Sequence, residues 1–153
     1  YPLEAAGCRI DENGKKYIRV KGVRWYTNID HGYRHNPLSL MSMADNIKYS
    51  KHKEIQGKKY QHYDNYDAIE IPYTDAIPCD YENLMGVPVT FLDKYCPEQF
   101  DIIWQACGNT RASAPKEILD EVGYTIHPED RGGCGVVNNK RQYARILIRK
   151  KHL

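Results

Sequence analysis

KKYIRVKGVRWYTNID, from Lys15 to Asp30, is the stretch that shows most directly which kind of fold to expect. Apolar or β-branched residues alternate in it with Tyr, Arg and Asn, both before and after Gly22. A period of two in aromatic and β-branched residues predicts β-strands, and an internal glycine predicts a bend. The stretch therefore predicts strand over Tyr17–Asn28, as two short strands or as one bent strand with its kink at Gly22.

The rest of the chain adds short strand patterns and one clear helix pattern. Ser113 or Ala114 before Pro115, apolar residues at helical spacing and then Gly123 predict a helix over Pro115–Val122. The remaining predicted strands are Ala68–Ile71, Val87–Leu92, Asp101–Cys107, which we expect to be buried, and Tyr143–Arg149. We therefore predict an α+β fold: a mixed, largely antiparallel sheet with few helices, and the Pro115–Val122 helix covering one face.

Charge is distributed unevenly along the chain, although the formal net charge is only +2. Basic residues gather in 15–24, 48–59 and 140–152, whereas 64–82 holds six acids and no Lys or Arg. Such segregation produces a local positive field that suits a polyanion such as nucleic acid. The alternative from charge alone is an ordinary solvated surface.

Length and cysteine content limit the class of protein. A chain of 153 residues is long enough for one domain with a core, and we predict a single domain over 1–153. Its five cysteines are far apart and form no CxxC pair, which disfavours a disulfide scaffold or a zinc ribbon and favours a reducing cytoplasm. No apolar run approaches the roughly 18 residues that span a bilayer, so we expect no membrane partner.

Familiar catalytic motifs are missing from the sequence. It contains no phosphate-binding GxxxxGK[ST] and no GxGxxG after a strand. Asn36-Pro37-Leu38 lacks the second proline and the aromatic residue of an adenine methyltransferase motif. His31 and His35 lie four apart, but Gly32 and Pro37 argue against a helix there, and we predict no metal site.

Three blocks of sequence resemble a known family. They are Arg9 to Asp30, with the core WYTNID; Tyr63 to Phe100, with YDNYDAIEI and MGVPVTFLDKYCPEQF; and Asn138 to Lys150, NNKRQYARILIRK. Together they resemble the C-terminal part of the EcoRI-type adenine-specific DNA methyltransferases. The resemblance covers nearly the whole chain and is weakest at 43–61 and 113–135.

The resemblance implies a cytoplasmic bacterial enzyme of a restriction–modification system. Such enzymes transfer the methyl group of S-adenosylmethionine to adenine N6 in double-stranded DNA. The family's cofactor and catalytic motifs are expected upstream of Tyr1, so no catalytic residue is assigned here and the cofactor-binding residues stay unknown. The chain would supply the late strands of a Rossmann-like methyltransferase fold and target-recognition elements, and would be inactive by itself.

DNA contact requires Lys and Arg for phosphates and Arg, Asn or Gln for base edges. On that ground we expect 43–61 to be a mobile, DNA-contacting insertion. The residues expected to bind DNA are Lys16, Arg19, Lys21, Arg24, Asn28, His31, Arg34, Lys51 and Lys53.

Two alternatives remain open at this point. The basic strands alone would also fit a free-standing nucleic-acid-binding module. Less favoured is a metal-dependent nuclease that uses His31, His35 and Asn36.

Overall fold

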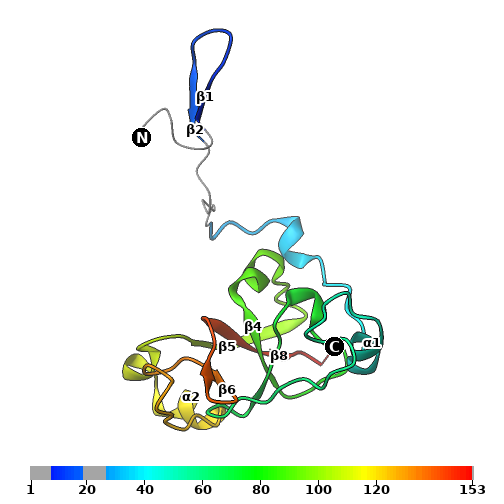
Figure 1. Cartoon of the computed structure of the whole chain (residues 1–153), viewed down its shortest axis with the longest axis vertical. Coiled ribbons are helices and arrows are strands. Elements are labelled where there is room, and N and C mark those ends of the chain that lie inside the picture. Colours follow the sequence, from blue (N-terminus) through cyan, green and yellow to red (C-terminus); the bar gives the residue numbers. More distant parts are fainter. Residues whose placement is uncertain (1–7, 19–26, 153) are drawn as a thin grey trace. The chain divides into compact units, whose positions relative to one another are not determined.

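The computed structural model describes residues 8–18 and 27–152, and the chain divides into two compact units at Asp30 (Figure 1). The first unit covers Tyr1–Asp30 and the second His31–Leu153. No helix of the described residues is long and apolar enough to cross a membrane.

The first unit contains an antiparallel hairpin of β1 (Cys8–Ile10) and β2 (Lys16–Ile18). Asp11 closes its turn, because one carboxylate oxygen accepts the amides of Asn13 and Lys15 at 3.0 and 2.9 Å. The Tyr17 hydroxyl donates to the other oxygen at 3.0 Å. β2 coincides with the start of the predicted strand Tyr17–Asn28, and residues 19–26 of that prediction lie outside the described residues.

The predicted end of that strand is wrong. Residues 27–30 form no strand, since the Ile29 amide bonds to the Thr27 side-chain hydroxyl at 3.0 Å and turns the chain.

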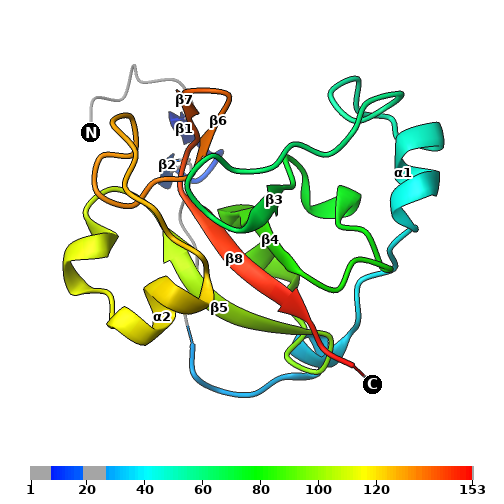
Figure 2. The same cartoon turned by 90° about the horizontal axis from the view of Figure 1, so that it is seen from below.

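The second unit is built on a four-stranded sheet in the order β3–β4–β8–β5. The strands are β3 (Ala68–Glu70), β4 (Leu84–Pro88), β5 (Phe100–Ala106) and β8 (Arg145–Lys150). β3 and β4 are parallel, whereas β8 runs antiparallel to both β4 and β5. Figure 2 shows β8, in red, between β4 and β5, so the last strand of the sequence is central in the sheet.

Both faces of this sheet are covered. Ile146 and Ile148 of β8 belong to one core cluster and Leu147 to the other, as expected where successive side chains point to opposite faces. Met43, in helix α1 (Met43–Tyr49), packs against the first cluster. Ile118, in α2 (Lys116–Glu121), packs against the second, as the predicted helix required.

Short elements complete the second unit. The hairpin of β6 (Val136–Val137) and β7 (Lys140–Arg141) turns at Asn138 and Asn139, which both have positive φ, at 49° and 60°. Two consecutive left-handed residues are the signature of a tight type I′ turn. The 3₁₀ helices are η1 (Gly32–His35), η2 (Thr74–Ala76), η3 (Val89–Lys94) and η4 (Thr110–Ser113).

The α+β class is confirmed, with few helices and mostly antiparallel pairing, but two further strand predictions need correction. The strand predicted over Val87–Leu92 ends at Pro88 and continues as η3, because proline cannot donate to a ladder. Asp101–Cys107 is not a fully buried strand: β5 pairs with β8 alone, and Ile102 is 41% exposed at this edge.

Candidate nucleic-acid interface

The residues expected to bind DNA are distributed over both units. Lys16 and Asn28 are exposed in the first unit, and Lys16 lies on β2. Three further cations of the prediction, Arg19, Lys21 and Arg24, lie outside the described residues.

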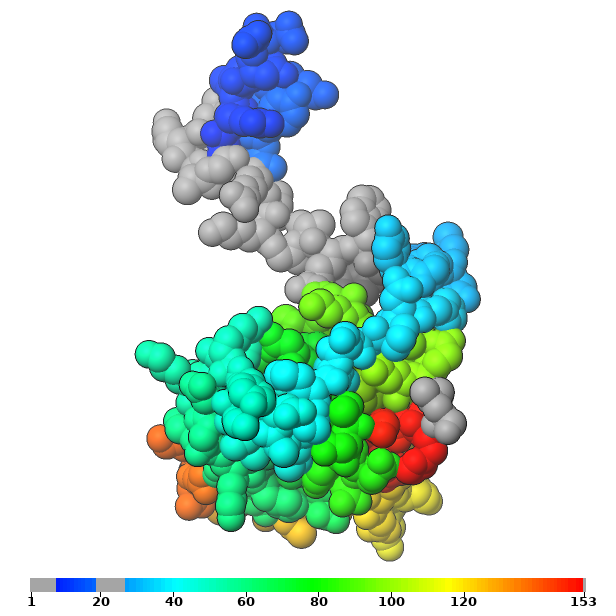
Figure 3. All heavy atoms as spheres, turned by 90° about the vertical axis from the view of Figure 1, so that its right-hand side faces the viewer, coloured from blue at the N-terminus to red at the C-terminus, as the bar shows by residue number. Residues whose placement is uncertain are grey.

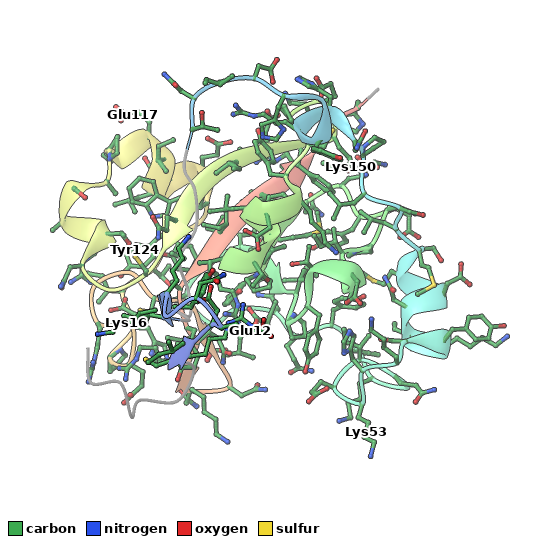
Figure 4. All side chains as sticks on the ribbon, turned by 90° about the horizontal axis from the view of Figure 1, so that it is seen from above. Glu12, Lys16, Lys53, Glu117, Tyr124 and Lys150 are labelled. Carbon is green, nitrogen blue, oxygen red and sulfur yellow. The ribbon has the colours of Figure 1, made fainter. Side chains whose placement is uncertain are left out.

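Four of these residues belong to the second unit. His31 is exposed and Arg34 is half-buried in η1. Lys51 and Lys53 follow α1, but only Lys51 has an acidic partner among the described residues, with its Nζ atom 2.7 Å from Asp75 Oδ2. Figure 4 shows the Lys53 side chain extending away from the ribbon.

Asp75 is engaged by two basic side chains. His52 Nε2 lies 2.8 Å from Asp75 Oδ1, and the His52 ring stacks on Tyr73 at 3.7 Å. Partial burial opposes ionisation of Asp75, but the hydrogen bonds from Lys51 and His52 outweigh it, so its pKa lies below the ordinary value. Lys51 is therefore partly neutralised, and Lys53 is the freer cation for a phosphate.

His35 is also committed to a partner. Its Nδ1 lies 2.5 Å from Glu98 Oε1, whereas the nuclease alternative needs this imidazole for a metal. Within residues 8–18 and 27–152, no group of three or more His, Cys, Asp or Glu side chains could hold a metal ion.

Most of the basic run at the end of the chain is paired with acids. Arg149, Lys150 and Lys151 lie 3.1, 3.4 and 3.1 Å from carboxylates of Glu121, Glu82 and Asp101. Lys140 and Arg141, by contrast, are exposed and form no ion pair with a described carboxylate. The free positive charge of this run therefore lies at the β6–β7 hairpin.

Arg145 is used inside the protein. Its Nε and Nη2 atoms donate to Glu70 Oε1 at 2.9 and 2.6 Å, across β4, and the Tyr63 hydroxyl donates to Glu70 Oε2. Burial lowers the pKa of Arg145, but the bonds and charge of Glu70 more than offset this, so the net shift is upward. Burial and the neighbouring Glu70 charge together raise the pKa of Tyr63 well above its ordinary value.

This ion pair lies at the wall of a pocket of about 250 Å³. Two lysines, two glutamines, one further glutamate, a tyrosine and three apolar side chains line the rest of it. The lining residues are Glu54, Ile55, Lys58, Lys59, Tyr60, Gln61, Glu70, Pro72, Val137, Gln142 and Arg145. Because Glu70 and Arg145 neutralise each other, the positive charge around the pocket comes from Lys58 and Lys59.

Sequence reasoning did not select Lys58, Lys59, Lys140 or Arg141 as site residues. Their signal was present in the basic runs 48–59 and 140–152. What the runs do not reveal is which members are neutralised, because the pairs join residues up to 75 positions apart, as Arg145 and Glu70 do.

Comparison with known proteins agrees with the resemblance seen in the sequence. A family model described as "Adenine-specific methyltransferase EcoRI" matches residues 1–151. The chain is 37% identical over 153 residues to the type II methyltransferase M.EcoRI of Escherichia coli, covering all of this chain and 38% of that protein. The matched part of M.EcoRI is its C-terminal portion.

Two Mycoplasma proteins are also similar. Identity is 32% over 143 residues to the type II methyltransferase M.MgeORF184P of Mycoplasma genitalium, and 28% over 143 residues to M.MpnI of Mycoplasma pneumoniae. Each match covers 93% of this chain and 40% of the relative. The chain thus spans about two fifths of the length of these relatives. No solved structure matches it.

Proposed function

We propose, on the premise that the chain belongs to the EcoRI family of adenine-specific methyltransferases, that it is the C-terminal, target-recognition portion of a DNA methyltransferase. The enzyme would transfer the methyl group of S-adenosylmethionine to adenine N6 in double-stranded DNA. Its setting would be a restriction–modification system in the bacterial cytoplasm. The observation that carries this proposal is 37% identity to M.EcoRI along the whole chain.

The division of labour follows from the residues that are present. A cofactor loop and an Asn-Pro-Pro-aromatic motif are not found in the sequence, so we assign S-adenosylmethionine binding and catalysis to the portion that the relatives have before the matched region. This chain would position duplex DNA.

The contact residues proposed for that task are the basic and amide side chains of both units. Lys16, Lys51 and Lys53 would bind phosphates, together with Lys21, while Arg24, Asn28 and Arg34 would lie nearer the bases. Arg19 and His31 complete the set. Exposure of Lys16, Asn28, His31 and Lys53 supports this assignment, since a phosphate or base edge can reach them.

Two measurements test the proposal. The complete gene product containing this chain, incubated with radiolabelled S-adenosylmethionine and unmethylated duplex DNA, should form N6-methyladenine. The chain alone should bind duplex DNA, with an affinity that falls steeply as salt rises because counterions are released. A complete protein that leaves adenine unmethylated on all duplexes would overturn the proposal, whereas salt-dependent binding without methylation would favour a free-standing nucleic-acid-binding module.

A further inference from the structure

Two segments of the second unit, far apart in sequence, line one pocket. Lys58, Lys59 and Gln61 come from the first segment, and Val137 of β6 and Gln142, which follows β7, come from the second. In Figure 3 the blue-green atoms of the first segment and the orange atoms of the hairpin region lie beside each other at the surface. We call the residues 58–61 and 137–142 the hairpin–loop surface.

The lysine side of this surface is held in place from below. Ile55 is 4% exposed in the core, and the Lys58 amide bonds to the Ile55 carbonyl at 2.9 Å. The Gly57 amide reaches the Ile47 carbonyl of α1 at 2.7 Å. Lys58 and Lys59 therefore project from a fixed turn, and their charge is directed outward.

The hairpin side is fixed as well. The Asn139 amide donates to Asp64 Oδ2 at 2.8 Å, and Asn138 Nδ2 donates to Gln61 Oε1 at 3.0 Å. At its base, the Val136 amide donates to the buried Asn65 side chain at 2.9 Å. A turn with this many tertiary bonds presents its side chains in one geometry, which reduces the entropy lost on binding.

Charge and chemistry at this surface match duplex DNA. Lys58, Lys59, Lys140 and Arg141 form no ion pair with any described carboxylate, unlike the cations of β8. Glu54 also lines the pocket, and its hydrogen bond with Tyr73 leaves its negative charge in place, so the four cations of this surface outnumber the one carboxylate that lines the pocket without a described cationic partner. The amide side chains of Gln61 and Gln142 also line the pocket, and amides can both donate to and accept from base edges.

We infer that the hairpin–loop surface is a further place where this protein contacts double-stranded DNA, an inference that rests on the proposed function. Lys58 and Lys59, which line the pocket, and Lys140 and Arg141, which lie on β7, bind phosphates. The side-chain amide of Asn139, at the tip of the hairpin, hydrogen-bonds to a base edge, because a two-stranded β-ribbon fits the major groove.

The test is a salt titration of DNA binding by the chain and its double variants. Two double variants change the surface: Lys58→Ala/Lys59→Ala and Lys140→Ala/Arg141→Ala. The control is Lys116→Ala/Lys150→Ala, which removes one charge from α2 and one from the C-terminal end of β8. Each lost phosphate contact lowers the slope of log affinity against log salt by about 0.9. Between about 50 and 200 mM salt, wild type should therefore lose about twelvefold more affinity than either hairpin–loop variant.

The control should keep the wild-type slope. Wild-type DNA binding with equal slopes in all variants would overturn this inference alone and leave the proposed function standing. Wild-type chain that binds no duplex DNA would overturn the inference together with the DNA-positioning role. All substituted side chains are at the surface, and circular dichroism of each variant should match wild type.

Base reading has its own variant. Asn139→Gly keeps a residue that adopts positive φ readily and removes only the amide side chain. It should preserve the salt slope and reduce the preference of the complete enzyme for its cognate duplex over a non-cognate one by at least about fivefold, within the range for one lost base contact. Unchanged preference would show that the tip does not read bases.

Discussion

The ring of Tyr63 occupies the space that a side chain on Gly86 would need. A Cβ atom on Gly86 would lie 2.7 Å from both Cε2 and Cζ of Tyr63, too close for two carbon atoms. Gly86 is in the middle of β4, and its missing side chain lets the tyrosine lie across the strand and reach Glu70 on β3. On the other edge of the ring, a Cβ atom on Gly135 would likewise lie only 2.5 Å from Cε1.

Gly86→Ala should therefore destabilise the second unit by about 1–3 kcal/mol, the usual cost of adding a carbon to a filled core. Tyr63 is 3% exposed and enclosed between two glycines, so it has nowhere to move. Urea unfolding followed by fluorescence would measure the loss.

Gly32→Ala is the matched control, since nothing lies within 4 Å of a Cβ at that position. Its stability should stay within about 0.5 kcal/mol of wild type. Equal effects of the two substitutions would contradict the packing described for Tyr63.

Arg145→Leu should be more damaging, because it leaves the Glu70 carboxylate buried with Tyr63 as its donor. Removing one partner of a buried ion pair typically costs about 3–5 kcal/mol. Arg149→Leu, on the same strand, breaks a pair whose side chains are 38% and 39% exposed and should cost no more than about 1 kcal/mol.

Chemical denaturation of the two arginine variants and of Glu70→Met/Arg145→Leu would check this. The double variant should recover part of the loss, since no unpaired charge stays inside. If Arg145→Leu were as stable as Arg149→Leu, the buried Arg145–Glu70 pair would not contribute to the stability of the fold as described.

Asp130→Asn should change how stability depends on pH. Asp130 is 3% exposed; it accepts the Gly132 amide at 2.7 Å, the His127 amide at 3.1 Å and the Tyr124 hydroxyl. Burial raises the pKa of this carboxyl, but these bonds and the Arg111 charge outweigh burial, so its pKa lies below 3.8.

An acid whose pKa is lower in the native state stabilises the fold above its unfolded pKa, and this contribution disappears as pH falls through the native value. The free energy of unfolding of wild type should therefore exceed that of Asp130→Asn by about 1.5–3 kcal/mol near pH 6–7. This difference in stability should shrink below about pH 4. Thermal melts across pH would show it. Asp120→Asn, at an exposed position of α2, is the control, and its stability at pH 6–7 should stay within about 0.5 kcal/mol of wild type.

Asn65→Ala should release the β6–β7 hairpin. The Asn65 side chain is 1% exposed and bonds to the Cys134 carbonyl at 2.8 Å and to the Val136 amide at 2.9 Å. Leaving these two backbone groups unpaired should cost about 2–4 kcal/mol. Amide hydrogen exchange at Val136 should accelerate more than at Ile148 in the sheet centre, and unchanged exchange at Val136 would contradict this role.

Sequence patterns predicted the elements that their own local sequence specifies, such as β8 and α2. β8 alternates between the two cores, and α2 has a proline at its start and a glycine after its end. Helix α1 was missed, although Ser42 caps it by accepting the Asp45 amide at 3.1 Å. A serine followed three residues later by an acid was the signal, and the sparse apolar residues around it concealed it.

The candidate site was predicted only as basic segments. Whether a lysine forms an ion pair depends on which acids lie near it in the folded chain. Lys51 pairs with Asp75, while Lys53, two residues later, pairs with no acid among the described residues. The place of Lys140 and Arg141 depends on the Asn138–Asn139 turn and on Asp64, and no local pattern contains that information.

The central position of β8 determines the order in which this sheet can be completed during translation. β3, β4 and β5 leave the ribosome before the strand that joins β4 to β5 has been made. Until then, β4 and β5 each present an open edge that another nascent chain could pair with. A message cut short before the codon for Arg145 would yield such a chain permanently, so we expect it to aggregate rather than to accumulate as a smaller folded protein.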